Sequence, residues 1–558
     1  MNLIGNINAI PFRRFRGGGG VAPIPPFPSI PGMIVRYSAS GLTNEQMKEN
    51  PVWVDKTGNG HDLQMKNFAW GGMSGVGGYN QNFNQWGYGN LSTATQTHTS
   101  YKIELSVPST LRTTNIYSNA YSTGKEGDIY DFTLNIVGLK DGASLRITKG
   151  VVSGVIEMIE KDGIYKIYQP IEAGWDQSRI YIFISNPNLI DLNITIEQLP
   201  LYPGALVFDG VDDYGVCDNF PILTKEKGYT VVVLRQWDQD FLNTTLTGGL
   251  LSTRNYSTGE GVAFEKIESS NKGYWNLGAG GIIDFAKSPF TWQTSKQYNN
   301  VGILKGNKNH GKPLCVGCGL SGGQQCGRFA IWELVFLDHD ATEEELTKIK
   351  DYFVKTYPWL FPDQAWTVTG KTNEDEDRAT IANITGNGND LVLSNFGFAE
   401  GSGYNEEGEY AGYLVTDGVD DKIISSIFKM GNDWTVIGDW ELINTGKNDN
   451  AGIVKFDSIV IYNYNSMLIN IKNGRNILIP DQNTVNAICS DGRIYSKDWK
   501  ESIYNEETES TSKNFLTIGY SGNTYTKIAF KNLAIYPTVL SREDCIKAYN
   551  YLQTLKAK

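Results

Sequence analysis

Thr57-Gly-Asn-Gly-His-Asp-Leu63 recurs 328 residues later as Thr385-Gly-Asn-Gly-Asn-Asp-Leu391. A second motif, Asp209-Gly-Val-Asp-Asp213, recurs as Asp417-Gly-Val-Asp-Asp421, only 208 residues later. Two copies of one unit therefore follow each other along the chain. The drop in spacing leaves about 120 extra residues between the two motifs of the first copy. This extra segment predicts a domain inserted into a loop of the first copy.

The two copies are predicted to be β-structured, and each is expected to end in one helix. The helix of the first copy is expected to start after Thr342, with Glu343, Glu344 and Glu345 in its first turn, and that of the second after Ser541, with Glu543 and Asp544. A Ser or Thr N-cap followed by acidic residues favours the start of a helix. β-Branched and aromatic runs predict the principal strands of the copies at Tyr229–Leu234, Phe329–Phe336, Trp434–Ile437 and Ile528–Tyr536.

The inserted segment also reads as β-structure, and a small β-sandwich or jelly roll is expected. Its strand-like runs, separated by turns, are Tyr130–Val137, Ser144–Thr148, Tyr165–Tyr168, Ile180–Ser185 and Leu192–Glu197. The predicted fold class is all-β, with tandem jelly-roll sandwiches, an insertion in the first and an extended N-terminal arm. The expected domains are an arm at 1–32, a first sandwich at 33–90 and 201–360, an insert at 91–200 and a second sandwich at 361–558.

The arm is rich in Pro and Gly, and Val-Ala-Pro-Ile-Pro-Pro-Phe-Pro-Ser-Ile-Pro31 favours an extended backbone. Such a segment cannot build a core of its own. One interpretation is a disordered tail. The other is a docking peptide that lays apolar anchors along another protein. The predicted docking residues are Phe12, Arg13, Arg14, Phe15, Arg16 and Phe27.

Composition excludes some classes of function. The 558 residues carry a net charge of −12, which argues against a nucleic-acid partner, since that role needs a basic surface. No run of about twenty apolar residues occurs, so no membrane insertion is expected. The start of the chain lacks the pattern of a signal peptide. The six cysteines are few and scattered, which predicts reduced thiols rather than a disulfide framework.

At its repeated motifs the chain resembles the concanavalin-A-like, laminin-G-type β-sandwich family. The resemblance rests on the turns Asp55-Lys-Thr-Gly-Asn-Gly60 and Phe208-Asp-Gly-Val-Asp-Asp-Tyr214 and on the two helix endings. It covers about residues 33–90 and 200–558, although the second copy has Asn383 in place of Asp55. Tandem copies behind a Pro/Gly-rich arm are similar in layout to structural proteins of tailed phages, including head fibres of crAss-like phages of gut Bacteroidetes.

The resemblance implies a structural bacteriophage virion protein of the head-fibre or decoration type, assembled in the host cytoplasm. Residues 1–32 would dock on a capsid or tail component, and the lectin-like domains would face outward, where they can contact host glycans. A homo-oligomer is expected, and a homotrimer by analogy with fibres. One alternative is a tail receptor-binding adhesin for capsular polysaccharide. A polysaccharide depolymerase is a further alternative.

No catalytic residue and no cofactor are predicted, so the chain is expected not to be an enzyme. Nucleophile-elbow, phosphate-loop and paired-acid strand motifs are missing from the sequence. The Asp-Gly-Val-Asp-Asp motifs fit either a calcium site or a hairpin turn, and the turn is preferred. Cys315, Cys318 and Cys326 with His310 are spaced like part of a zinc site. Buried reduced thiols are preferred there, because Thr517 and Tyr520 take the matching places of the second copy.

The predicted glycan- or partner-binding site lies in the Gly- and Asn-rich stretch 68–88. Aromatic rings stack on sugars, and amides bind hydroxyl groups. The alternative is a long loop that packs its aromatic side chains against the inserted domain. The candidate residues are Trp70, Tyr79, Phe83, Trp86 and Tyr88.

Overall fold

The computed structural model describes residues 25–557 with internal gaps. The gaps are residues 90–93, 119–128, 151–153, 171–178, 224–227, 243, 245, 254–262, 267–272, 277–281, 285–300, 306–312, 321–323, 386, 407, 409, 427, 430, 444–450, 457–458, 464–466, 472–474, 480–484, 497–498, 500, 504–512, 515, 519 and 522–523. In the described part, no helix is long and apolar enough to cross a membrane.

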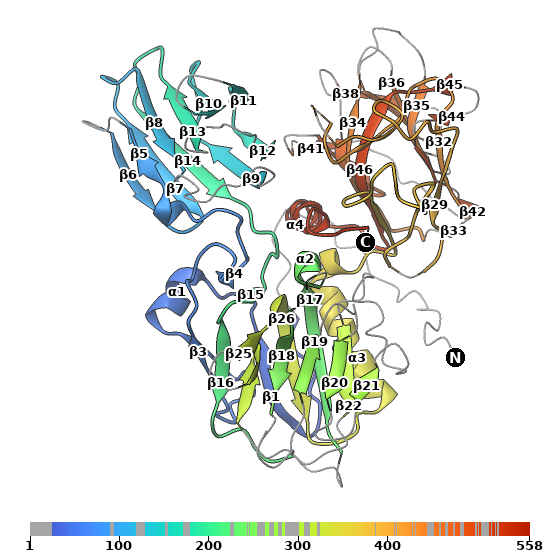
Figure 1. Ribbon diagram of the computed structural model, residues 1–558. Coiled ribbons are helices and arrows are strands. Elements are labelled where there is room, and N and C mark those ends of the chain that lie inside the picture. Colours follow the sequence, from blue (N-terminus) through green and yellow to red (C-terminus); the bar gives the residue numbers. More distant parts are fainter. Residues whose placement is uncertain are drawn as a thin grey trace.

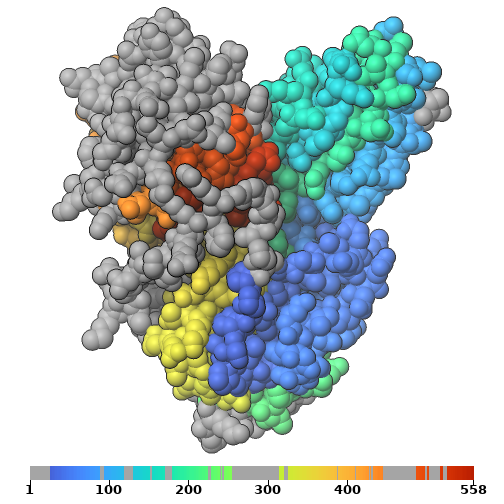
Figure 2. Space-filling model, turned by 180° about the vertical axis from the view of Figure 1, so that it is seen from behind, coloured from blue at the N-terminus to red at the C-terminus, as the bar shows by residue number. Residues whose placement is uncertain are grey.

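The predicted all-β class is confirmed: three β-sandwiches make up the molecule (Figure 1). The first sandwich, at the bottom of Figure 1, is interrupted by the inserted sandwich, and the second sandwich follows along the chain. Viewed from behind, the inserted sandwich projects as a separate lobe (Figure 2).

The first sandwich has two sheets. One sheet runs in the order β22 (Val301–Lys305), β17 (Thr230–Trp237), β26 (Arg328–Leu337), β15 (Leu206–Asp209) and β4 (Gly75–Val76), with β1 (Met33–Ser38) also paired to β26. The facing sheet runs β2 (Val52–Trp53), β3 (Leu63–Lys66), β16 (Tyr214–Cys217), β23 (Leu314–Val316), β18 (Gly248–Ser252), β19 (Ala263–Lys266), β20 (Gly273–Asn276) and β21 (Ile282–Asp284), joined by the hairpin β24 (Cys318–Leu320) and β25 (Gln324–Cys326).

The second sandwich repeats the central strand order of both sheets and adds strands at the edge of the first. Its first sheet runs β30 (Gly403–Tyr404), β31 (Leu414–Val415), β46 (Ile528–Tyr536), β34 (Thr435–Leu442), β39 (Val485–Cys489), β40 (Arg493–Ser496) and β41 (Glu501–Ile503), with β27 (Gln364–Thr367) on β46. Its other sheet runs β28 (Thr380–Ile381), β29 (Leu391–Ser394), β32 (Lys422–Ser425), β43 (Leu516–Ile518), β35 (Ala451–Phe456), β36 (Ile459–Asn463), β37 (Met467–Ile471) and β38 (Arg475–Ile479). Short pairs β33 (Phe428–Lys429) with β42 (Lys513–Asn514) and β44 (Tyr520–Ser521) with β45 (Thr524–Tyr525) complete it.

The duplication extends to irregular features of the backbone. A register shift in the pairing of β17 with β26 falls between Leu234 and Arg235, and the matching shift on β34 falls between Asp439 and Trp440. Asn67 and Asn395 both take a left-handed conformation, with φ of 66° and 70°. The two copies therefore share one backbone pattern, as the repeated motifs predicted.

The inserted sandwich consists of two facing sheets. One is ordered β11 (Val155–Ile159), β10 (Ser144–Lys149), β13 (Ile180–Ser185), β8 (Thr113–Tyr117) and β5 (Gly87–Tyr88). The other is ordered β12 (Gly163–Pro170), β9 (Ile129–Val137), β14 (Leu192–Gln198), β7 (Lys102–Val107) and β6 (Thr95–His98). From β7 to β14 the chain crosses repeatedly between the sheets in the manner of a jelly roll, and only β10 and β11 follow each other within one sheet. The insert begins earlier than residue 91, because Phe83 and Trp86 lie in its core.

Helices cover the outer face of the first sheet in each copy. Helix α3 (Glu343–Thr356) starts at the predicted N-cap Thr342, whose hydroxyl accepts from the Glu345 backbone N–H. Helix α4 (Arg542–Leu552) starts at Ser541. The shorter helices are α1 (Asn44–Glu49), α2 (Gln239–Leu242), η1 (Phe83–Gln85) and η4 (Pro358–Leu360). Because β26 lies between the sandwich core and this outer layer, it is buried on both sides.

One apolar cluster joins the modules. It includes residues from the arm, the first sandwich, α3, the linker after α3, the second sandwich and α4, among them Ile30, Trp332, Phe353, Trp359, Ile437 and Tyr551. Helix α4 sits between the modules in Figure 1, and the Trp332 and Tyr551 rings meet edge to face at 6.1 Å. Burial of this much apolar surface favours a fixed arrangement over free domain motion.

The inserted and second sandwiches also touch. The Lys531 ammonium, on β46, lies 5.5 Å from the ring centre of Tyr168 on β12 and 5.6 Å from that of Tyr413. Lys531 is only 6 % exposed, and burial lowers its pKa. A lysine buried between aromatic rings and acidic groups fits a specific contact between the modules.

The structure corrects the arm prediction at its C-terminal end. Phe27 packs edge to face on Tyr352 of α3 at 4.8 Å, and Ile30 is buried in the shared cluster. Phe27 therefore anchors this segment to its own chain, where its ring also covers the Arg36 guanidinium, and it is not a free docking residue. Phe12, Arg13, Arg14, Phe15 and Arg16 lie outside the described residues.

Candidate functional site

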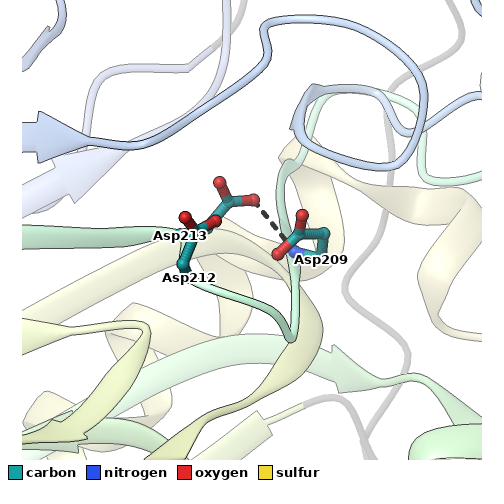
Figure 3. A group of neighbouring side chains, drawn as sticks. All are labelled: Asp209, Asp212 and Asp213. Carbon is teal, nitrogen blue, oxygen red and sulfur yellow. Dashed lines mark hydrogen bonds between the residues drawn. The ribbon is translucent and has the colours of Figure 1, made fainter. Parts of the chain in front are cut away.

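The aspartate-rich turn between β15 and β16 is the first candidate site (Figure 3). Asp213 is fully buried, and one of its carboxylate oxygens accepts from the Asp209 backbone N–H at 3.0 Å. Its other oxygen accepts from the Ser74 hydroxyl at 2.9 Å. The Asp209 carboxylate accepts from the Val211 N–H at 2.8 Å, and Gly210 between them has a φ of 79°. The carboxylates thus close a tight turn.

The second copy builds the same turn. The two Asp421 oxygens accept from the Asp417 N–H at 2.7 Å and from the Ser402 hydroxyl at 3.2 Å. The Asp417 carboxylate accepts from the Val419 N–H at 2.7 Å. Identical bonding in two copies supports the preferred interpretation of the motif as a structural turn.

The electrostatics of the turns suit a neutral carboxyl. Burial, followed by the nearby Asp209 carboxylate, raises the pKa of Asp213 to about 7. Burial raises the pKa of Asp421 to about 6. In each turn the three carboxylates lie close enough for one cation, within 4.8 Å of one another. This closeness keeps the calcium site as the alternative to the preferred turn, but the bonds described above satisfy both oxygens of Asp213 without an ion.

The predicted aromatic site is wrong for the four residues whose side chains are described. Trp70 and Tyr79 are each 8 % exposed, Trp86 is 4 % exposed, and Phe83 is fully buried. Phe83 and Trp86 pack together at 4.8 Å in the core of the insert. Trp70 belongs to the core of the first sandwich. The side chain of Tyr88 lies outside the described residues, although its backbone forms β5.

The reason lies in the path of the chain, which crosses here from the first sandwich into the insert. The first sandwich and the insert each bury the aromatic rings that lie next to them. The Tyr79 ring stacks on that of Tyr101 in the insert, with ring centres 5.2 Å apart. The alternative, a loop that packs its aromatic side chains against the inserted domain, describes Tyr79, Phe83 and Trp86, whereas Trp70 packs in the core of the first sandwich.

The cysteine prediction also needs correction. Cys318 and Cys326 form a disulfide that links the paired strands β24 and β25. The other four cysteines are free and buried. A zinc site that used both of these sulfurs is incompatible with the disulfide, and His310 lies outside the described residues. In the second copy Tyr520 pairs with Tyr525 at the same place.

Sequence reasoning missed a buried ion pair in the first sandwich. The Glu333 carboxylate on β26 is fully buried and accepts two bonds from the Arg36 guanidinium, each at 3.0 Å. Ser38 and Tyr357 hydroxyls donate to it at 2.8 Å. Burial raises the pKa of Glu333, while Arg36 opposes that rise. A signal was present, because Glu333 interrupts the apolar run from Phe329 to Leu337.

No family model and no curated protein matches the chain. Among solved structures, the Trypanosoma rangeli sialidase in complex with sialic acid is 9 % identical over 83 % of this chain and 84 % of that one, with a TM-score of 0.24. The botulinum neurotoxin serotype D binding domain is 12 % identical over 62 % of this chain and 89 % of its own, with a TM-score of 0.23. Structural similarity this weak indicates neither a family nor a function, and the architecture follows from the strand pairings alone.

Proposed function

We propose that the protein is a structural bacteriophage virion protein of the head-fibre or decoration type. It is held to a capsid or tail protein by its N-terminal arm and displays its sandwiches outward. The observation that carries the proposal is the apolar cluster that runs from Ile30 through both sandwich copies. A rigid multi-module body suits a protein that holds a surface at a fixed distance from a particle.

The base of the arm supports this reading. Phe27 and Ile30 fix the chain against α3 and the shared cluster, so the segment that precedes residue 25 starts from a defined place. A peptide tethered in this way binds a partner with a smaller loss of freedom than one on a long free linker. Assembly as a homotrimer is part of the proposal, since repetition strengthens weak contacts.

The proposal assigns no reaction to the chain. A retaining glycosidase needs two accessible carboxyl groups about 5 Å apart. The acidic turns bring carboxylates that close together, yet Asp213 and Asp421 are 0 % and 1 % exposed and are bound to backbone N–H groups. These acids are therefore poor candidates for a depolymerase.

A tail adhesin for capsular polysaccharide remains the second candidate function. It needs an accessible glycan-binding surface, and the outer sheet face of the insert with Tyr117, Tyr181 and Phe183 is the candidate for it.

Peptide mass spectrometry of purified phage particles tests the proposal, with light scattering of the purified chain for its oligomeric mass. We expect the protein in particles at a copy number that matches a structural component, and a trimer mass in solution. Its absence from particles would reject the virion assignment, and a monomer mass would reject the trimer.

A further inference from the structure

One outer face of the inserted sandwich carries three aromatic rings, from neighbouring strands. Strand β13 turns its isoleucines into the core, so Tyr181 and Phe183 point to the other side of the sheet, where they are half-buried. Tyr117 on β8 pairs directly with Tyr181. The ring centres are 5.3 Å apart for Tyr117 and Tyr181, and 5.9 Å for Tyr181 and Phe183. We call these three rings, with Arg146 and Arg179, the aromatic face.

Two arginines flank the rings. Arg146 on β10 pairs with Phe183 on β13, and its guanidinium lies 5.0 Å from the centre of the Phe183 ring. Arg179 lies 5.2 Å from the centre of the Tyr117 ring. The strands of this sheet contain only Arg146, Lys149 and Glu157 as charged residues, so with Arg179 the sheet is net positive. The whole chain has a net charge of −12, which makes this a local basic surface on an acidic protein.

Two glycines at the edge of this sheet, Gly87 in β5 and Gly89 just after it, lie against side chains of β8. A Cβ atom on Gly87 would lie 2.5 Å from the Tyr117 ring, and one on Gly89 would lie 2.2 Å from the Asn115 amide. Side chains at these positions would displace Tyr117 and Asn115. Glycine at both positions therefore lets the Tyr117 ring and the Asn115 amide lie close against the edge of the sheet.

The second sheet of the insert differs in chemistry. Its strands carry Lys102, Glu104, Asp131, Lys166 and Glu197, which make it net negative. Its outward Tyr168 contacts Lys531 of the second sandwich. A solvent-facing sheet surface is normally polar, so aromatic rings gathered on one face indicate a binding surface more than a requirement of the fold.

We propose that the aromatic face binds an acidic polysaccharide. The rings stack on the apolar faces of sugar units, and the two guanidinium groups pair with sugar carboxylates. The net positive charge of this sheet favours an acidic chain over a neutral one. This inference rests on the proposed adhesive display of the sandwiches and names the ligand class for it.

Affinity electrophoresis of the full-length chain tests the inference, through gels that contain polygalacturonate, alginate or hyaluronate. Gels with neutral dextran or pullulan serve as the comparison. We expect retardation by at least one acidic polymer, and none by the neutral ones. Arg146→Gln and Tyr181→Leu should each weaken the binding roughly tenfold, as expected for the loss of one charged or stacking contact. Lys102→Gln, on the opposite sheet, is the matched control and should bind like the parent chain.

Three results would overturn the inference: no retardation by any acidic polymer, equal retardation by neutral polymers, or an equal loss in Lys102→Gln. Thermal melts of each variant show whether it is folded, and Arg146→Gln changes an exposed side chain, so it should keep the parent fold. Incorporation of the Arg146→Gln variant into particles separates the two proposals. If the parent chain and its variants enter particles but none of them binds an acidic polymer, the glycan site is contradicted while the virion assignment stands.

Discussion

Replacing Asp213 with Asn should change how the stability of the first sandwich depends on pH. Asp213 has a pKa of about 7 in the folded chain, because it is buried beside Asp209. An unfolded aspartate has a pKa of about 3.9. The folded state therefore binds a proton more tightly, and the stability that this proton contributes is present in full below pH about 4 and is lost as the pH rises through about 7.

The magnitude follows from the two pKa values. A shift of about 3 units corresponds to about 4 kcal/mol in total. About 2 kcal/mol of this is lost between pH 5.5 and pH 8.5, by linkage. Asn does not titrate, yet its side-chain oxygen can still accept from the Asp209 N–H and its amide can donate to Ser74. Relative to the parent, Asp213→Asn should thus gain about 2 kcal/mol on going from pH 5.5 to pH 8.5.

Melting curves of parent and variant at both pH values provide the assay. For a domain of this size a gain of about 2 kcal/mol corresponds to roughly 4–8 °C in the difference between their midpoints. Asp421→Asn is the matched control, and since its pKa is about 6 the gain should be only about 1 kcal/mol. If Asp213→Asn and the parent keep a constant difference in midpoint at the two pH values, the buried-carboxyl account is refuted.

Three further predictions concern the buried ion pair, the disulfide and calcium. Arg36→Met should destabilise the first sandwich by about 3–5 kcal/mol in urea unfolding, because it leaves Glu333 buried without its cation, and adding Glu333→Leu should restore most of the loss. A double variant no more stable than Arg36→Met would contradict this. Peptide mapping without reductant should find the Cys318–Cys326 disulfide. Its reduction should lower the free energy of unfolding by roughly 2–3 kcal/mol, because the disulfide closes only a short loop. Alkylation of both thiols in the native chain would disprove the disulfide. Addition or chelation of calcium should leave the melting midpoints unchanged, because the turn carboxylates already accept N–H and O–H groups; a saturable upward shift with calcium would favour the ion site.

The repeated motifs predicted the duplicated β-fold well, because a turn that needs Gly210 or Gly418 at positive φ leaves a visible trace in the sequence. The alternation of the insert strands was equally readable, as in Ile180–Ser185. The placement of aromatic residues was not. Trp70 and Trp86 sit in the cores of different modules, and no local pattern tells which core takes a ring.

The features that depend on distant contacts escaped prediction. Arg36 meets Glu333 across 297 residues, and Ile30 joins a cluster that also contains Leu552. The aromatic face had a local signal, since Tyr181 and Phe183 alternate with isoleucines on one strand. Recognising it as a face required Tyr117 and Arg146, which only the strand register brings beside them.

Particle incorporation of a chain that begins at residue 25 tests the central claim most directly. This truncation keeps Phe27 and Ile30, whose contacts fix the start of the described chain against α3 and the shared cluster, and removes only the segment proposed to dock. Full-length protein, expressed in the same way, is the control. We expect the shortened chain to fold with an unchanged melting midpoint and to be absent from purified particles. If it enters particles as efficiently as the full-length protein, attachment through the N-terminal arm is contradicted.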